Sequence, residues 1–195
     1  MIEQLQELVP RRRLSRGEAI AVAELQAARL RRALRIDDAC FSDEDLRALP
    51  TVRVEPVNGL GVSGATRRVG NLWIILVNQD EAEVRQRFTI AHEIKHILDD
   101  QATVHLHRRG LLASGQNWLT ERICDYFAAN LLMPRLWMKR AWVSATQDPM
   151  ELARLFDVSV DAVRIRLEQL GLSDPVQRCS SPEFDPVQLP ARAAA

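Results

Sequence analysis

Apolar residues recur every three or four positions in several stretches of the chain, which is the spacing of a helix with one buried face. The capping-box pair Ser15 and Glu18 opens the first long stretch, and Pro134 follows the end of the last one. Long helices are therefore predicted at 18–34, 80–98 and 118–132, with shorter ones at 1–9, 37–49, 150–156 and 160–170.

Strand patterns lie between the first two long helices. Residues 51–54 alternate apolar with polar positions, and residues 72–77 form an unbroken apolar run typical of a strand buried on both faces. Residues 65–69 are separated from that run by Gly-Asn at 70–71, a pair typical of hairpin turns. The pattern predicts an α+β fold in which a small three-stranded sheet, mixed or antiparallel, supports the helix over 80–98.

The chain divides into three parts by composition. Residues 1–145 are expected to form the main domain, 146–172 a small helical segment packed on it, and 173–195 a flexible tail rich in Pro, Ser and Ala. The helical segment is similar to a helix-turn-helix, with Arg164 and Arg166 on its second helix. It either binds DNA or packs on the main domain and recognises a substrate. The second interpretation is favoured, because the full basic surface of a DNA reader is absent.

The overall charge gives the chain no field that would draw it to nucleic acid or membranes. It has 195 residues, 47% of them apolar, and 26 Lys and Arg balance 26 Asp and Glu. One face of the helix over 18–34 carries Arg29, Arg31, Arg32 and Arg35. No aromatic residues lie between these arginines, which favours a solvated basic face over a surface that binds nucleic acid.

The apolar runs bear on the cellular location of the protein, and the cysteines bear on disulfides and metal binding. The longest apolar run is too short to span a membrane, and no secretion signal opens the sequence, so a cytoplasmic location is expected. Cys40, Cys124 and Cys179 are widely spaced and form no C-x-x-C pair. Neither a disulfide framework nor a cysteine metal site is indicated, so a bound metal would rely on histidine and carboxylate.

The pentapeptide His92-Glu-Ile-Lys-His96 lies in the helix predicted over 80–98, which Asn78 is expected to cap. Residues four apart lie on one face of a helix, so the two imidazoles can bind a single metal ion. Glu93 lies beside them, where it can take a proton from a water on that ion. The alternative is a chance match to H-E-x-x-H on a surface helix.

A second pair four residues apart, Glu121 and Asp125, lies in the helix predicted over 118–132. A catalytic site with two histidines and one glutamate takes its carboxylate from a separate helix and leaves one position for water, a role that Glu121 suits. Asp125, one turn further on, can reach His92 and fix its tautomer by a hydrogen bond. Taken alone, both acids are equally compatible with the solvated face of an amphipathic helix.

Three blocks of sequence now form a set: Ile-Leu-Val-Asn at 75–78, Arg-Gln-Arg-Phe-Thr-Ile-Ala-His-Glu-Ile-Lys-His at 85–96, and Glu-x-x-x-Asp-x-Phe-Ala-Ala-x-Leu-Leu-Met-Pro at 121–134. Together they resemble the ImmA/IrrE family of bacterial metallo-endopeptidases. The resemblance extends over residues 52–172 and implies a zincin-like fold. Lys95 departs from the family, which often has a small residue at this position, and bears on the shape of the cleft.

The same resemblance implies a set of site residues. A divalent ion, Zn²⁺ or alternatively Mn²⁺ or another ion, would be held by His92, His96 and Glu121. Glu93 would be the catalytic carboxylate, and Asp125 would lie behind one of the histidines.

Members of this family typically cleave a partner helix-turn-helix repressor. The resemblance therefore predicts a metal-dependent endopeptidase of narrow specificity that derepresses genes of a mobile element, a toxin-antitoxin-like system or a stress response. The alternative is a non-catalytic DNA- or protein-binding regulator with a structural metal site. Glu93 favours the enzyme, because a structural site has no chemical need for it.

Overall fold

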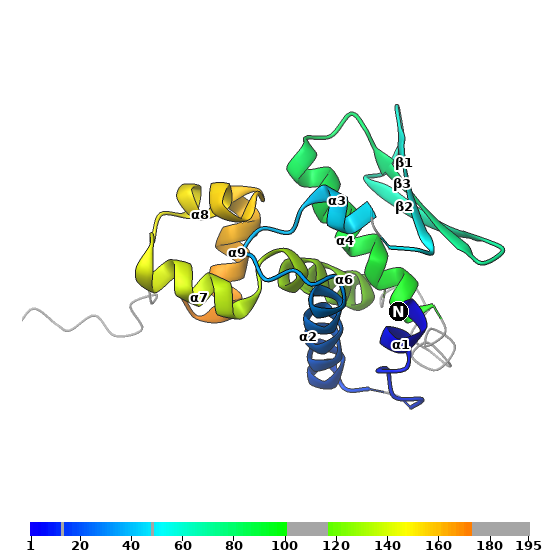
Figure 1. Ribbon diagram of the computed structural model, residues 1–195, viewed down its shortest axis with the longest axis horizontal. Coiled ribbons are helices and arrows are strands. Elements are labelled where there is room, and N and C mark those ends of the chain that lie inside the picture. Colours follow the sequence, from blue (N-terminus) through cyan, green and yellow to red (C-terminus); the bar gives the residue numbers. More distant parts are fainter. Residues whose placement is uncertain (13, 48, 101–116, 173–195) are drawn as a thin grey trace, which may run out of the picture.

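The computed structural model describes residues 1–12, 14–47, 49–100 and 117–172 of the chain (Figure 1). The tail predicted at 173–195 lies outside this part. Within it, three strands and eight helices form an α+β fold, as the sequence predicts. The helices are α1 (Ile2–Gln6), α2 (Arg16–Ala33), α3 (Asp43–Arg47), α4 (Glu83–Asp99), α6 (Asn117–Leu132), α7 (Arg135–Ser144), α8 (Pro149–Phe156) and α9 (Val160–Leu170).

The three strands form one mixed sheet, which confirms that part of the prediction. They are β1 (Val52–Val57), β2 (Gly64–Val69) and β3 (Leu72–Asn78), in the order β1-β3-β2. The central strand β3 is parallel to β1 and antiparallel to β2. Gly70 has a φ of 60° in the turn between β2 and β3, a conformation that glycine adopts without the strain of a side chain.

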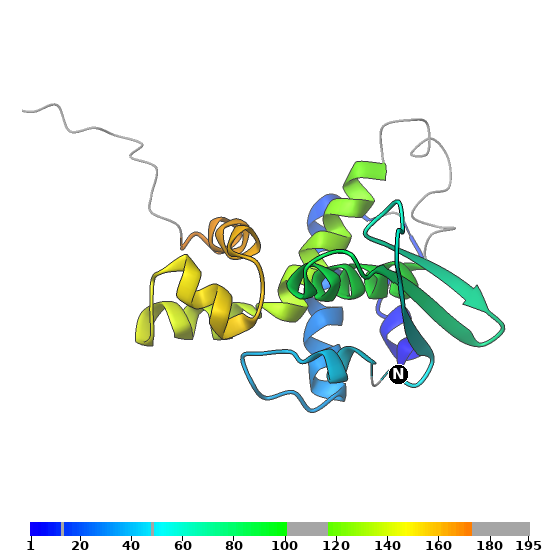
Figure 2. The same cartoon turned by 90° about the horizontal axis from the view of Figure 1, so that it is seen from above.

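Helix α4 lies at the centre of the fold, between the sheet and the pair α2 and α6 (Figures 1 and 2). Its apolar positions are fully or almost fully buried: Ile90, Ala91, Ile94, Ile97 and Leu98. The apolar residues of α4 recur every three or four positions and also occur next to one another, so the helix is buried on more than one side.

Strand β2 lies unusually close to α4 at Gly64. A Cβ atom at this position would be 2.4 Å from Thr89 Cγ2 and 3.2 Å from the Leu76 carbonyl oxygen. Real Cβ atoms do not approach other atoms so closely, so the absence of a side chain at Gly64 allows the strand to pack on the helix.

Lys95 lies in the core and not in a cleft. Its side chain is 2% exposed, and its ammonium group donates hydrogen bonds to Gln26 Oε1 at 2.8 Å and Asp99 Oδ1 at 2.6 Å. The Gln26 amide in turn donates to the Leu5 carbonyl oxygen, so the lysine joins α4 to α2 and α1. The departure from the family at this position therefore adds a charge that is paired inside the protein.

Several helix boundaries differ from the predicted ones. Helix α4 begins at Glu83, after Ala82, and Asn78 does not cap it. The Asn78 amide instead accepts a hydrogen bond from the Asp80 backbone N–H and donates one to the Leu60 carbonyl oxygen. The helix predicted at 37–49 shortens to α3, and α7 was not predicted.

Arg31 does not belong to the solvated basic face predicted for α2. It is 6% exposed and donates hydrogen bonds to the Leu131 carbonyl oxygen at 2.9 Å and to the Asp38 carbonyl oxygen. The backbone of α6 near its C-terminal end accepts the first of these bonds, so Arg31 ties α2 to α6.

Helices α7, α8 and α9 gather at one end of the molecule, away from the sheet (Figures 1 and 2). Two buried arginines fasten α8 and α9 to the rest of the chain. Arg87 on α4 donates to the Asp157 carbonyl oxygen at 2.8 Å and pairs with the Asp157 carboxylate. Arg166 on α9 is fully buried and donates to the Met133 carbonyl oxygen at 3.1 Å and to Asn130 Oδ1 at 2.6 Å.

No helix within the described ranges is long and apolar enough to cross a membrane.

Replacing Arg166 with alanine is expected to destabilise the fold by about 3 kcal/mol, because two buried acceptors lose their charged donor. Arg164→Ala on the same helix is the matched control. Arg164 is exposed and pairs with the exposed Asp161, so its loss should change the free energy of unfolding by less than about 0.5 kcal/mol. Urea unfolding of both variants measures the difference, and equal values would contradict the assigned role of Arg166.

Candidate metal centre

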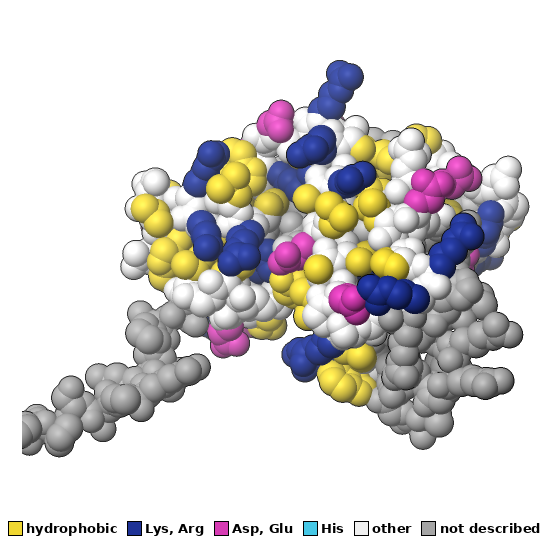
Figure 3. Space-filling model, turned by 90° about the horizontal axis from the view of Figure 1, so that it is seen from below, with side chains coloured by type: hydrophobic (Ala, Val, Ile, Leu, Met, Phe, Trp, Pro, Cys, Tyr) yellow, Lys and Arg dark blue, Asp and Glu magenta, His cyan; other side chains and the backbone are white. Residues whose placement is uncertain are grey.

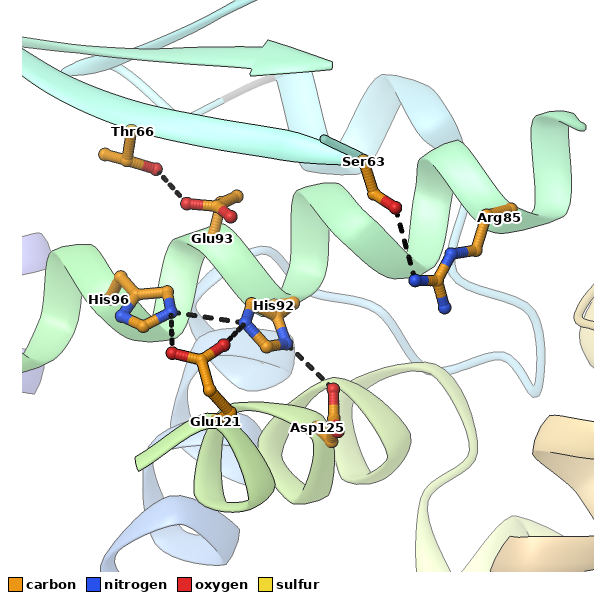
Figure 4. A network of polar contacts seen from close by, with 8 residues as sticks. All are labelled: Ser63, Thr66, Arg85, His92, Glu93, His96, Glu121 and Asp125. Atoms are coloured by element: carbon orange, nitrogen blue, oxygen red, sulfur yellow. Dashed lines mark hydrogen bonds and ion pairs between the residues drawn. The ribbon is translucent and has the colours of Figure 1, made fainter. Parts of the chain in front are cut away.

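Two histidines of α4 and one glutamate of α6 meet at a single point (Figure 4). The His92 and His96 Nε2 atoms are 3.2 Å apart. Glu121 Oε2 lies 3.1 Å from His92 Nε2, and Glu121 Oε1 lies 3.6 Å from His96 Nε2. The one-turn spacing on α4 puts both imidazoles on the side that faces α6, where Glu121 points back at them.

These separations fit one tetrahedral ion. With metal-ligand bonds of about 2.05 Å, neighbouring donors of a tetrahedral zinc site lie about 3.3 Å apart. The three distances of 3.1, 3.2 and 3.6 Å bracket that value. Two neutral imidazoles and a carboxylate form a donor set that accepts zinc and several other divalent ions.

Asp125 lies one turn beyond Glu121 on α6, and its Oδ1 atom is 2.9 Å from His92 Nδ1. This contact leaves His92 Nε2 facing the metal-binding point. Burial lowers the pKa of His92, but the hydrogen bond to Asp125 and the charges of Asp125, Glu121 and Glu93 outweigh it, so the pKa is raised.

Glu93 is nearly buried, between α4 and β2. One of its carboxylate oxygens, Oε2, accepts a hydrogen bond of 2.6 Å from Thr66 Oγ1 (Figure 4). The close approach of β2 at Gly64 brings Thr66 within reach. Thr66 was missed at the sequence level, because a strand pattern does not reveal which helix residue a given strand residue faces.

Cys124 is a second residue near the site that the sequence pattern did not indicate. Its sulfur, one ring nitrogen of His92 and one ring nitrogen of His96 all lie within 4.8 Å of one another. The spacing of three residues from Glu121 to Cys124 could have signalled this, since such residues share a helix face. Burial, followed by the charge of Asp99, raises the pKa of the Cys124 thiol. Glu121 is the candidate third donor, because its carboxylate oxygens lie 3.1 and 3.6 Å from the two histidine Nε2 atoms, separations that fit a tetrahedral zinc site.

Comparison with solved structures identifies a shared fold. The chain is similar to a Mycobacterium tuberculosis transcriptional regulator, with a TM-score of 0.59 and 18% sequence identity over 91% of this chain. It covers 54% of that protein, and therefore spans about half of its length. At this level of identity the likeness shows the fold alone. No curated protein matches the chain.

The fold and the donor set together define an α+β protein with a candidate histidine-carboxylate metal centre. The M78 peptidase family, described as an IrrE N-terminal-like domain, matches residues 51–168. This range covers more than half of the chain, from β1 into α9, so the chain belongs to this family. The resemblance to ImmA/IrrE proteins inferred from the sequence blocks is thereby confirmed, and the family fits a metallopeptidase with a divalent ion.

In the metal-free protein, NMR titration is expected to give His92 a pKa above its usual 6.5, and Asp125→Asn should lower it by removing a charged acceptor. A raised pKa means that protonated His92 stabilises the metal-free fold below pH 6.5, and that this stabilisation is lost as the pH rises through the folded-state pKa. The affinity for a metal ion should increase as the pH rises, since binding needs the neutral His92 ring. An unchanged pKa in Asp125→Asn would contradict the contact.

Proposed function

We propose that this chain is a metal-dependent endopeptidase of narrow specificity that cleaves a partner helix-turn-helix repressor and so derepresses genes. The observation that carries the proposal is the convergence of His92, His96 and Glu121 beside Glu93, with donor separations of 3.1 to 3.6 Å. The family match supports a metallopeptidase, and the likeness to a Mycobacterium tuberculosis transcriptional regulator supports a role in transcription. A repressor substrate implies a cytoplasmic site of action.

The ligands in this proposal are His92, His96 and Glu121, and the ion is Zn²⁺ or, as an alternative, Mn²⁺ or another divalent ion. Asp125 orients His92 from behind. The two ligand helices, crossing beneath a short sheet, support a zincin-like core. A bound ion would polarise the scissile carbonyl and lower the pKa of the attacking water.

Glu93 is the proton carrier of the reaction. Its carboxylate accepts a proton from the water whose oxygen attacks the carbonyl carbon. The C–N bond then breaks, and Glu93 delivers the proton to the leaving nitrogen. Thr66 donates to Oε2 of Glu93 and so restricts the rotation of the carboxylate, which leaves Oε1 to exchange the proton.

A non-catalytic regulator that binds DNA through α9 is the alternative. The exposed charges of α9 are Asp161, Arg164 and Glu168, two acids and one base, because Arg166 is buried. On the face seen in Figure 3, Lys and Arg side chains are scattered among apolar and acidic ones and form no continuous stripe. A DNA reader needs a continuous basic surface, so both observations favour the protease.

Incubation of the protein with helix-turn-helix repressors of the same genome and Zn²⁺ or Mn²⁺ is expected to produce two defined fragments of its partner repressor. Glu93→Gln should cut at least about 1000-fold more slowly, because an amide cannot carry the proton. Mass spectrometry of the fragments measures both rates and locates the cut. Cleavage by Glu93→Gln at the wild-type rate would remove Glu93 from the mechanism, and an intact repressor with both proteins would contradict the proposed activity.

The third ligand is tested by metal titration of two variants of α6. Glu121→Gln is expected to weaken Zn²⁺ binding by more than about 100-fold, since loss of a direct ligand should exceed the effect of an outer hydrogen-bond partner. Cys124→Ala should leave the affinity unchanged. The opposite pattern would assign the third position to Cys124, and competition with a chromophoric chelator measures both affinities.

A further inference from the structure

A pocket of about 250 Å³ lies beside the candidate metal centre, at the junction of α4, α6 and α9. Phe88 of α4, Ala129 of α6 and Val158 of the turn before α9 contribute apolar walls, together with Ala162 and Ile165 of α9. The lining has more apolar than polar surface, and Ile165 is 56% exposed.

The pocket lies next to the contact between α4 and α6 that brings the metal donors together. Along the contact between α4 and α6, His96 lies opposite Glu121 and His92 lies opposite Asp125. Asp125 contacts His92 and also lines the pocket, and Phe88 precedes His92 by one helical turn. One turn rises about 5.4 Å. A chain extended from the metal-binding point advances about 3.3 Å per residue, so it reaches the pocket within about two residues.

Two buried arginines hold the walls of the pocket in place. Arg87 fixes the turn between α8 and α9 to α4, through the Asp157 carbonyl oxygen and carboxylate. Arg166 fixes α9 to the C-terminal end of α6, through Met133 and Asn130. The wall made by α9 is therefore anchored at both ends of the pocket, so the pocket exists before anything binds.

We propose that this pocket binds a large apolar side chain of the polypeptide being cut, located within about two residues of the scissile bond. The proposal rests on the proposed endopeptidase function. It identifies the substrate as a segment with Leu, Met, Ile or Phe at that position, and it makes α9 part of substrate recognition.

Size and polarity both select this occupant. Pockets for whole small molecules usually span about 300 to 1,000 Å³, and this one is smaller, so it suits a single side chain. A charged side chain would lose its hydration against the apolar walls of the pocket, Phe88, Ala129 and Ile165. The three charged residues of the lining, Arg85, Asp125 and Asp161, are all exposed. The pocket therefore discriminates by apolar contact, which is typically good for about tenfold to 200-fold between a large and a small side chain.

The test uses a tryptic peptide library of bacterial proteins as the probe, with the full-length metal-loaded protein and mass spectrometry of the new peptide ends. The wild type is expected to cut with an enrichment of about tenfold or more for large apolar residues at one position near the scissile bond. Ala162→Phe fills the pocket and should shift that position to Ala and Gly. Ile165→Asp places an acid at an already exposed position of the pocket, and should shift the preferred substrate residue to Lys and Arg.

Val143→Phe is the matched control, because Val143 is 80% exposed on α7 and the added ring is the same as in Ala162→Phe. It should retain the wild-type preference. Metal content and melting temperature are measured for every protein, and Ile165→Asp keeps the test decisive if Ala162→Phe does not fold. Wild-type cleavage without a preferred large residue, or with a preference unchanged in Ile165→Asp, overturns the pocket assignment and leaves the endopeptidase function standing. Absence of any cleavage of peptides and repressor by the wild type overturns both.

Discussion

The contact between α4 and α6 is the constraint on which the candidate site depends. Each helix carries two polar residues four positions apart, and only a close crossing of the two helices brings all four together. The apolar residues of α4 and α6 drive that crossing, since Ile90, Ile94, Phe127 and Leu131 are all buried. The donors are thus carried on rigid elements whose separation is set by packing, so a metal ion would find them already assembled.

Charged groups inside the protein set how the parts of the chain are joined. Lys95 joins α4 to α2, Arg31 joins α2 to α6, and Arg87 and Arg166 join α8 and α9 to the core. In each case a long side chain reaches a backbone or side-chain oxygen that the apolar core cannot satisfy. These contacts orient the helices more specifically than apolar packing alone, because a misplaced arginine would leave its acceptors unpaired.

The sequence patterns predicted features that depend on the spacing of neighbouring residues, such as strands and helix faces. The existence of three strands and the placement of His92 with His96 on one helix face follow from periodicity of two and of four residues, and so does the placement of Glu121 with Asp125. The roles of these side chains stay predictions. The first strand, predicted at 51–54, is longer and covers Val52–Val57. The patterns failed where the outcome depends on distant partners. The burial of Arg31 and Arg166 could not be predicted from neighbouring residues. Their hydrogen bonds go to the carbonyl oxygens of residues 131 and 133, which are distant in the sequence. Thr66 was missed for the same reason, since it reaches Glu93 through tertiary packing. Cys124 is different, because its spacing of three residues from Glu121 is a local signal.

The register of the β2–β3 hairpin has a consequence for the charge state around Glu93. Thr66 pairs with Ile75 and its neighbour Arg67 pairs with Ile74. Successive side chains of a strand point to opposite faces, so a slip of one residue would bring Arg67 to the position of Thr66. A guanidinium there would hold Glu93 in an ion pair, whereas a hydroxyl only steadies it. The tight turn at Gly70 therefore determines whether the buried carboxylate remains a base or becomes half of a salt bridge.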